Sequence, residues 1–171
     1  MLNKLHLVLN QINEWVGRSV AWLVLAMTLV TFAIVVLRYG FNFGSIAMQE
    51  SVVYLHCFIF MLAIGYTLKH DQHVRVDVFY QYFTERQKAW VNLLGSIFLL
   101  LPVCGFLLYS SWDYTSNSWQ IHEESPEAGG LPLVFILKTL IPVMPILLAS
   151  QVIANMIDHL KVLRSTSQVS N

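Results

Sequence analysis

The sequence predicts an all-α integral membrane protein with four transmembrane helices. Of its 171 residues, 56% are apolar and only 12% are charged, and the mean hydropathy is +0.59. Soluble domains carry about 25% charged residues, so this chain has too few polar groups to cover a globule in water. The formal net charge is zero and the basic residues are scattered, which excludes nucleic acid as an expected partner.

The four predicted spans are the runs between charged residues that are long enough to cross a bilayer. A transmembrane helix needs about 20 mostly apolar residues, and such runs predict spans at about 19–38, 50–69, 89–112 and 132–158. Pro142 and Pro145 remove two backbone donors from the last span, so we expect a kink or a break near 142–145. The loops are too short to fold separately, which makes residues 1–171 a single membrane domain.

The segment before the first span, residues 1–17, combines helical periodicity with a polar face. Apolar residues recur at helical spacing, while Lys4, Asn10, Gln11 and Glu14 take the other side. This pattern is typical of an amphipathic helix that lies at the bilayer surface. A polar extension of the first span is the alternative, and the sequence leaves both open.

The distribution of Lys and Arg predicts the orientation of the chain. Of the ten basic residues, only Arg38 and Lys138 fall on one side of the spans, and the others fall on the opposite side. Basic residues in short loops are retained in the cytoplasm. We therefore predict that both termini and the loop 69–88 are cytoplasmic, and that the loop 113–138 faces outward.

Polar residues at the outer ends of the spans are candidates for contact with a partner. Arg38 and Glu50 flank the first outer loop, where they could form an ion pair or could each mark a helix end by snorkelling to water. Gln49 and Glu50 open the second span and are suited to contact with a partner helix. Lys138 is expected to reach the outer interface.

Three further groups of polar residues lie deeper in the chain or toward its other end. Lys69, His73, Arg75 and Asp77 belong to the densest polar stretch and are candidates for contact with a partner or with lipid; Arg75 and Asp77 could bind neighbouring backbone or lipid phosphate. Gln151 and Asn155 share one face of the fourth span with Asp158; such a stripe points toward protein, although solvation at the interface remains an alternative. His56, inside the second span, is expected to be packed and hydrogen-bonded within the bundle.

These groups do not form a recognisable centre for chemistry. The two cysteines lie inside apolar runs without metal-ligand spacing, and His70 and His159, a conceivable haem pair, are too close to the helix ends. We assign no catalytic residue, no substrate-binding residue, no metal ligand and no cofactor.

Several motifs, taken in order, resemble a known family. These are RYGFNF after the first span, QE at the start of the second, GYTLKHDQHVRVDVFY after it, and ESPEAGGLPLVFILK in the outer loop. Together they are similar to the small, Q-type membrane subunit of TRAP (tripartite ATP-independent periplasmic) transporters, over most of residues 30–145. Where many members carry Trp and two acidic residues, this chain has Met48, Gln49, Glu50 and Ser51, so only Glu50 matches in character.

The resemblance implies a scaffold subunit in the bacterial inner membrane. Its partners would be a large, M-type membrane subunit that holds the sodium and substrate sites and a periplasmic binding protein that delivers the substrate. Membrane phospholipid is a further expected partner. The GGLP…K pattern resembles the branch associated with organic carboxylates. Two other classes remain open from the residues alone: a self-sufficient oligomeric carrier or channel, and a haem or quinone membrane anchor.

Overall fold

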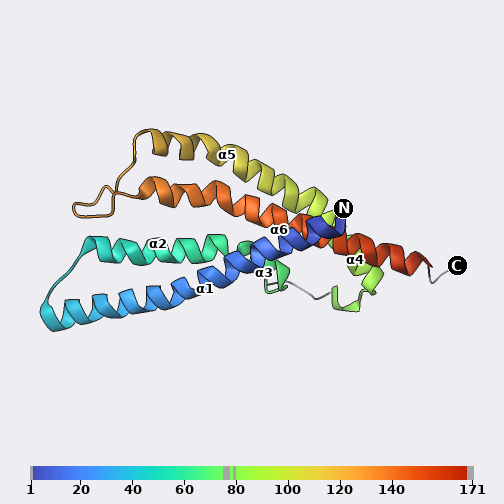
Figure 1. The fold of residues 1–171 in the computed structure, drawn as a ribbon, viewed down its shortest axis with the longest axis horizontal. Coiled ribbons are helices and arrows are strands. Elements are labelled where there is room, and N and C mark those ends of the chain that lie inside the picture. The colour runs from blue at the N-terminus through green and yellow to red at the C-terminus, as the bar shows by residue number, and fades with distance from the viewer. Residues whose placement is uncertain (1, 75–77, 79, 169–171) are drawn as a thin grey trace.

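The chain folds into a bundle of long helices. A computed structural model describes residues 2–74, 78 and 80–168, and these residues contain no strand. Within them, four helical segments are long and apolar enough to cross a membrane: Asn3–Phe41, Ile46–Lys69, Glu85–Gln120 and Val134–Arg164. The predicted all-α class and the predicted number of spans are therefore confirmed. Figure 1 shows both chain termini at one end of the bundle, which we call the termini end, and we call the other the loop end.

The first span belongs to a single uninterrupted helix, α1 (Leu2–Phe41), of 40 residues. At a rise of 1.5 Å per residue such a helix is about 60 Å long, about twice the thickness of a hydrocarbon layer. Residues 2–17 are thus continuous with the first span, as the alternative of a polar extension expects. Whether this part of α1 lies at the bilayer surface stays a prediction.

The second span consists of two helices, α2 (Ile46–Leu62) and the short α3 (Ile64–Lys69), which meet at Ala63. Ser45 begins α2, because its side chain accepts a hydrogen bond from the Met48 amide at 3.4 Å and so satisfies one of the free amides of the first turn. The helix packs between α1 and α6 (Val134–Gln168), as Figure 1 shows. No residue of α2 is buried within this chain, so part of its surface stays uncovered.

The third span contains a wide turn that the sequence analysis did not predict. After the 3-10 turn η1 (Tyr80–Tyr82), the chain forms α4 (Glu85–Gly95), the π-helical segment η2 (Ser96–Leu100) and α5 (Leu101–Gln120). The Leu101 amide donates to the Ser96 carbonyl, five residues back. Pro102 follows directly, and a proline both lacks an amide donor and clashes with the preceding turn; a π turn there gives its ring room.

The fourth span, α6 (Val134–Gln168), is the central helix and packs against all the other α helices of the bundle; Figure 1 shows it between α5 and the pair α1 and α2. Of the two predicted alternatives at Pro142 and Pro145, a kink or a break, the helix shows no break, because it continues through both residues. Pro142 leaves the Lys138 carbonyl without its helical donor, and the Thr115 hydroxyl supplies one at 3.3 Å. A kink there stays a prediction.

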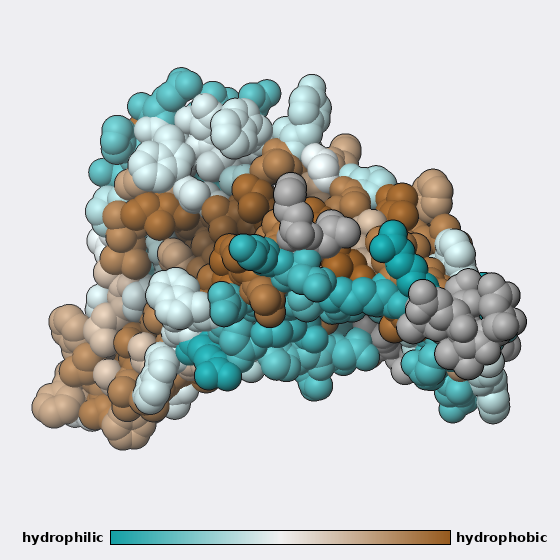
Figure 2. Space-filling model, turned by 45° about the vertical axis from the view of Figure 1, so that its right-hand side comes forward, coloured by the Kyte–Doolittle hydropathy of each residue, from teal (hydrophilic) through white to brown (hydrophobic). Residues whose placement is uncertain are grey.

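Large apolar side chains cover much of the surface of the bundle. Figure 2 shows broad areas of them on the face that it draws, and Trp22, Phe32 and Phe106 are each about two thirds exposed or more. Such a surface is costly in water and suits contact with lipid or with other membrane helices.

Candidate functional site

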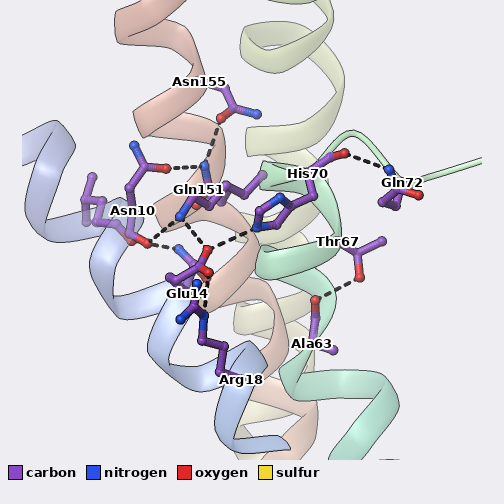
Figure 3. A network of polar contacts seen from close by, with 12 residues as sticks. Asn10, Glu14, Arg18, Ala63, Thr67, His70, Gln72, Gln151 and Asn155 are labelled. Carbon is purple, nitrogen blue, oxygen red and sulfur yellow. Dashed lines mark hydrogen bonds and ion pairs between the residues drawn. The ribbon is translucent and has the colours of Figure 1, made fainter. Parts of the chain in front are cut away.

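A cluster of polar side chains lies where α1, α3 and α6 meet near the termini end, and we call it the polar junction. Figure 3 shows side chains of these helices directed toward one another there. Its members come from segments far apart in the sequence: His6, Asn10, Asn13, Glu14 and Arg18 from α1, Lys69 and His70 at the end of α3, and Ser150, Gln151, Asn155 and Asp158 from α6.

Glu14 is the charged centre of the polar junction. Its Oε2 atom accepts a hydrogen bond from Lys69 Nζ at 2.7 Å and lies 3.0 Å from His70 Nε2, while its Oε1 atom accepts one from Arg18 Nε at 2.7 Å. Lys69 also donates to the Asn10 carbonyl at 3.3 Å. One carboxylate therefore binds the end of α3 to α1.

Gln151 joins α6 to α1. Its side chain is 0% exposed, and its amide nitrogen donates to the side-chain oxygens of Asn10 and Asn155, each at 2.9 Å. A second contact between the same helices lies nearer the end, where His6 Nε2 is 2.6 Å from Asp158 Oδ2. The two hydrogen bonds donated by this buried nitrogen help to fix the register of α6 against α1, while the Gln151 side-chain oxygen has no partner among the described residues.

Close backbone approach accompanies these polar contacts. Asn13, 1% exposed, donates to Ser150 Oγ at 3.0 Å and to the Leu9 carbonyl at 3.1 Å, and its side-chain oxygen occupies the space that a Cβ atom on Gly65 would need. Small residues allow membrane helices to come this close. The junction is therefore a tightly packed structural site.

At the loop end, Glu50 binds the loop between α5 and α6 to the start of α2. Its Oε1 atom accepts a hydrogen bond from Ser125 Oγ, and its Oε2 atom accepts one from the Leu131 amide at 2.6 Å. A Cβ atom on Gly130 would lie 2.4 Å from Ser125 Oγ and 2.8 Å from Glu50 Oε1. Glycine at this position allows the carboxylate to reach the loop.

Lys138 holds the same loop to α6. Its Nζ atom donates to Glu123 Oε2 at 2.5 Å and lies 3.9 Å from the centre of the Tyr114 ring, a favourable position for a cation. The Lys138 ammonium holds the pKa of the Glu123 carboxyl below its usual range. The pair therefore contributes stability at neutral pH, and that contribution is lost as the pH falls through the lowered pKa.

The structure gives the predicted contact residues different surroundings. Glu50, Lys69, Lys138, Gln151 and Asn155 make the contacts within the chain that are described above. For these residues, the polar groups that we assigned to a partner or to lipid bind other parts of the same chain.

The remaining predicted residues lie outside these contacts. Arg38 and Gln49 are exposed and line one shallow groove beside Ser45. The suggested ion pair between Arg38 and Glu50 is not formed among the described residues. His73 is half-buried in the loop after α3, and Arg75 and Asp77 lie outside the described residues.

A cavity of about 570 Å³ opens beside the polar junction, between the end of α3, the region of α4 and η2, and α6. Its walls combine apolar side chains such as Leu68 and Leu100 with polar ones such as Asn92 and Asn155. No group of three or more His, Cys, Asp or Glu side chains suited to a metal ion was found in the described part of the chain.

Sequence reasoning missed the partners on α1. Asn10 and Glu14 were recognised only as the polar face of an amphipathic segment, and Asn13 was not singled out. The spacing of Asn10, Glu14 and Arg18, four residues apart, places them on one helical face and could have indicated a shared partner.

Comparison with known proteins gives two matches. The family model described as "Tripartite ATP-independent periplasmic transporters, DctQ component" matches residues 27–162. The chain is also 28% identical over 112 residues to the C4-dicarboxylate TRAP transporter small permease protein DctQ of Vibrio cholerae serotype O1. That alignment covers 63% of this chain and 48% of the relative, so the chain spans about half of the relative's length. No solved structure matches the chain.

Proposed function

Because this chain belongs to the DctQ component family of tripartite ATP-independent periplasmic transporters, we propose that it is the static scaffold subunit of a sodium-driven importer of organic carboxylates. Family membership and the four apolar helices make it a multi-pass protein of the bacterial inner membrane. Its role is to support and anchor a large, elevator-type subunit that carries the substrate across the bilayer.

The use of polar groups within the chain is the observation that carries the proposal. Polar groups in membrane-spanning helices either pair with one another or line a pathway for a substrate or ion. Here the polar groups pair with one another. At the termini end, Glu14 and Lys69 join α1 to α3, and Gln151 joins α6 to α1. At the loop end, Glu50 and Lys138 bind the loop between α5 and α6. These contacts join helices and the loop to one another at both ends of the bundle, which supports a static role.

The partners follow from the same family. We propose a large M-type membrane subunit, which holds the sodium and substrate sites, and a periplasmic substrate-binding protein, with phospholipid around the bundle. An organic carboxylate as substrate is supported by the Vibrio relative, whose name specifies C4-dicarboxylates.

Orientation gives a first test of this proposal. In a variant with Cys57→Ser and Cys104→Ser, which removes both native thiols, a cysteine at exposed Gln72 should react with a membrane-impermeant maleimide only after the cytoplasmic side is opened. A cysteine at exposed Glu127 should react in intact spheroplasts. Labelling of Gln72→Cys from outside would contradict cytoplasmic termini.

Reconstitution gives the decisive test. Liposomes that contain this chain alone should take up no organic carboxylate under an inward sodium gradient. Uptake should require the large membrane subunit and the binding protein from the same gene cluster, because the transport sites are placed in those partners. Sodium-driven accumulation by this chain alone would refute the scaffold role in favour of a self-sufficient carrier.

A further inference from the structure

One outward face of α2 carries a polar side chain at membrane depth. Gln49, Val53, His56 and Phe60 are all exposed, and at 3.6 residues per turn their positions fall within a stripe about 60° wide. His56 is ten residues along the helix from Ile46, or about 15 Å at 1.5 Å per residue. We call this stripe the α2 outer face.

The imidazole of His56 differs from the exposed hydroxyls of Thr28, Thr31 and Ser110, which also lie in the spans. The hydroxyls of Thr28, Thr31 and Ser110 each donate to a carbonyl three or four residues back in their own helix, so they need no other partner. For His56, the described residues provide a stacked contact with Phe60, with ring centres 6.4 Å apart, and no hydrogen bond. The predicted packing of His56 inside the bundle is therefore wrong for this chain by itself.

An imidazole without a hydrogen-bond partner is unfavourable in hydrocarbon. A neutral histidine has one N–H donor and one ring-nitrogen acceptor, and polar groups within membrane spans usually face protein or a water-filled cavity. His56 is far from either end of the second span, which runs from Ile46 to Lys69, so its short side chain has no route to water. A polar group of another protein could supply the hydrogen bond that the His56 imidazole lacks.

The polar character of the α2 outer face continues to the loop end. Gln49 belongs to the stripe and also lines the shallow groove with Arg38 and Ser45. A lipid tail has no hydrogen-bond acceptor for the Gln49 amide or the Arg38 guanidinium. The end of a neighbouring transmembrane helix has free carbonyls and polar side chains that could accept their hydrogen bonds.

We propose that the α2 outer face is the surface on which the large membrane subunit packs, and that this subunit offers a hydrogen-bonding group to His56. The proposal rests on the function proposed above and adds the face and the residue through which the two subunits meet. It places a hydroxyl, carboxamide, carboxylate or free backbone carbonyl of the partner opposite the imidazole.

Photo-crosslinking in the complete transporter tests the face. A benzophenone amino acid at Phe60 should form an adduct with the large subunit, and the same amino acid at exposed Phe106 of α5 should give none. An adduct from Phe106 and none from Phe60, or an adduct from Phe60 with a second copy of this chain, would overturn the proposal. If the wild-type chain does not co-purify with the large subunit at all, the proposed function fails instead.

Substitution tests the hydrogen bond. His56→Phe keeps the stacked ring and removes both polar atoms, so it should reduce co-purification of the large subunit about three- to tenfold, the effect of one hydrogen bond between membrane helices. His56→Gln should restore most of it, and Thr28→Val should change nothing. Wild-type recovery with His56→Phe would refute the role of the imidazole.

Discussion

Gly65→Val is expected to lower the melting temperature of the purified chain by several degrees. A Cβ atom at position 65 would lie 1.9 Å from Asn13 Oδ1 and 3.1 Å from the Leu147 carbonyl, so a branched side chain forces α3 away from both α1 and α6. Asn13 cannot turn aside without losing its bonds to Ser150 and Leu9. Overpacking of this kind costs about 1–3 kcal/mol.

The matched control for this prediction is Gly105→Val. A Cβ atom on Gly105 has no neighbour within 4 Å, so the same substitution in α5 should leave the melting temperature nearly unchanged. Thermal unfolding of both variants in one detergent, followed by circular dichroism, compares them directly. Equal losses at the two positions would mean that the close approach at Gly65 does not constrain the fold.

The number of spans could be predicted because the bilayer imposes a simple rule on the sequence. A helix must remain apolar for about 20 residues to cross. Charged residues such as Glu50 and Lys69 bound apolar runs of about that length. The ends of the helices were predicted less well. The third helical segment runs from Glu85 to Gln120, beyond the expected 89–112, because a helix can continue through the polar residues 85–88 and 113–120 that flank the apolar run.

The polar junction could not be predicted because it depends on which helices touch. Gln151 and Asn155 were correctly placed on one face of the fourth span, and a polar stripe there was expected to meet protein. The protein is the chain itself: the Gln151 amide bonds Asn10, 141 residues away in sequence. The spacing of Gln151 and Asn155 along α6 does not indicate which other helix their side chains contact.

The helical continuity at the prolines has a similar origin. Pro142 removes one hydrogen bond from α6, which predicts a break when that helix is considered alone. The replacement donor for the Lys138 carbonyl is Thr115 of α5, 23 residues before Lys138, and Pro145 is fully buried in the bundle. A neighbouring helix therefore supplies the hydrogen bond that the Lys138 carbonyl loses to Pro142.

Glu14→Ala is expected to destabilise the chain strongly, because it removes the acceptor shared by Arg18, Lys69 and His70. The Lys69 side chain is only 24% exposed, so its ammonium would stay largely buried without a counter-charge. Leaving such a charge unpaired is far more damaging than removing the whole pair. The melting temperature should fall by several degrees, and α1 should exchange its amide hydrogens faster near the junction.

Glu85→Ala is the control, because Glu85 forms an ion pair at 3.1 Å with Lys88 of the same helix, and its own side chain is 84% exposed. Lys88 is nearly as covered as Lys69, at 28% exposed, but it keeps a contact with the Tyr80 ring, and no second helix depends on the pair. A pair with one exposed partner contributes little, so that variant should unfold close to the wild type. A Glu14→Met, Lys69→Met double variant should recover part of the stability lost in Glu14→Ala, since no buried charge then remains unpaired. Equal losses in Glu14→Ala and Glu85→Ala would show that the junction does not bind α3 to α1, and a scaffold whose second span is not fixed to its first could not hold a moving partner in place.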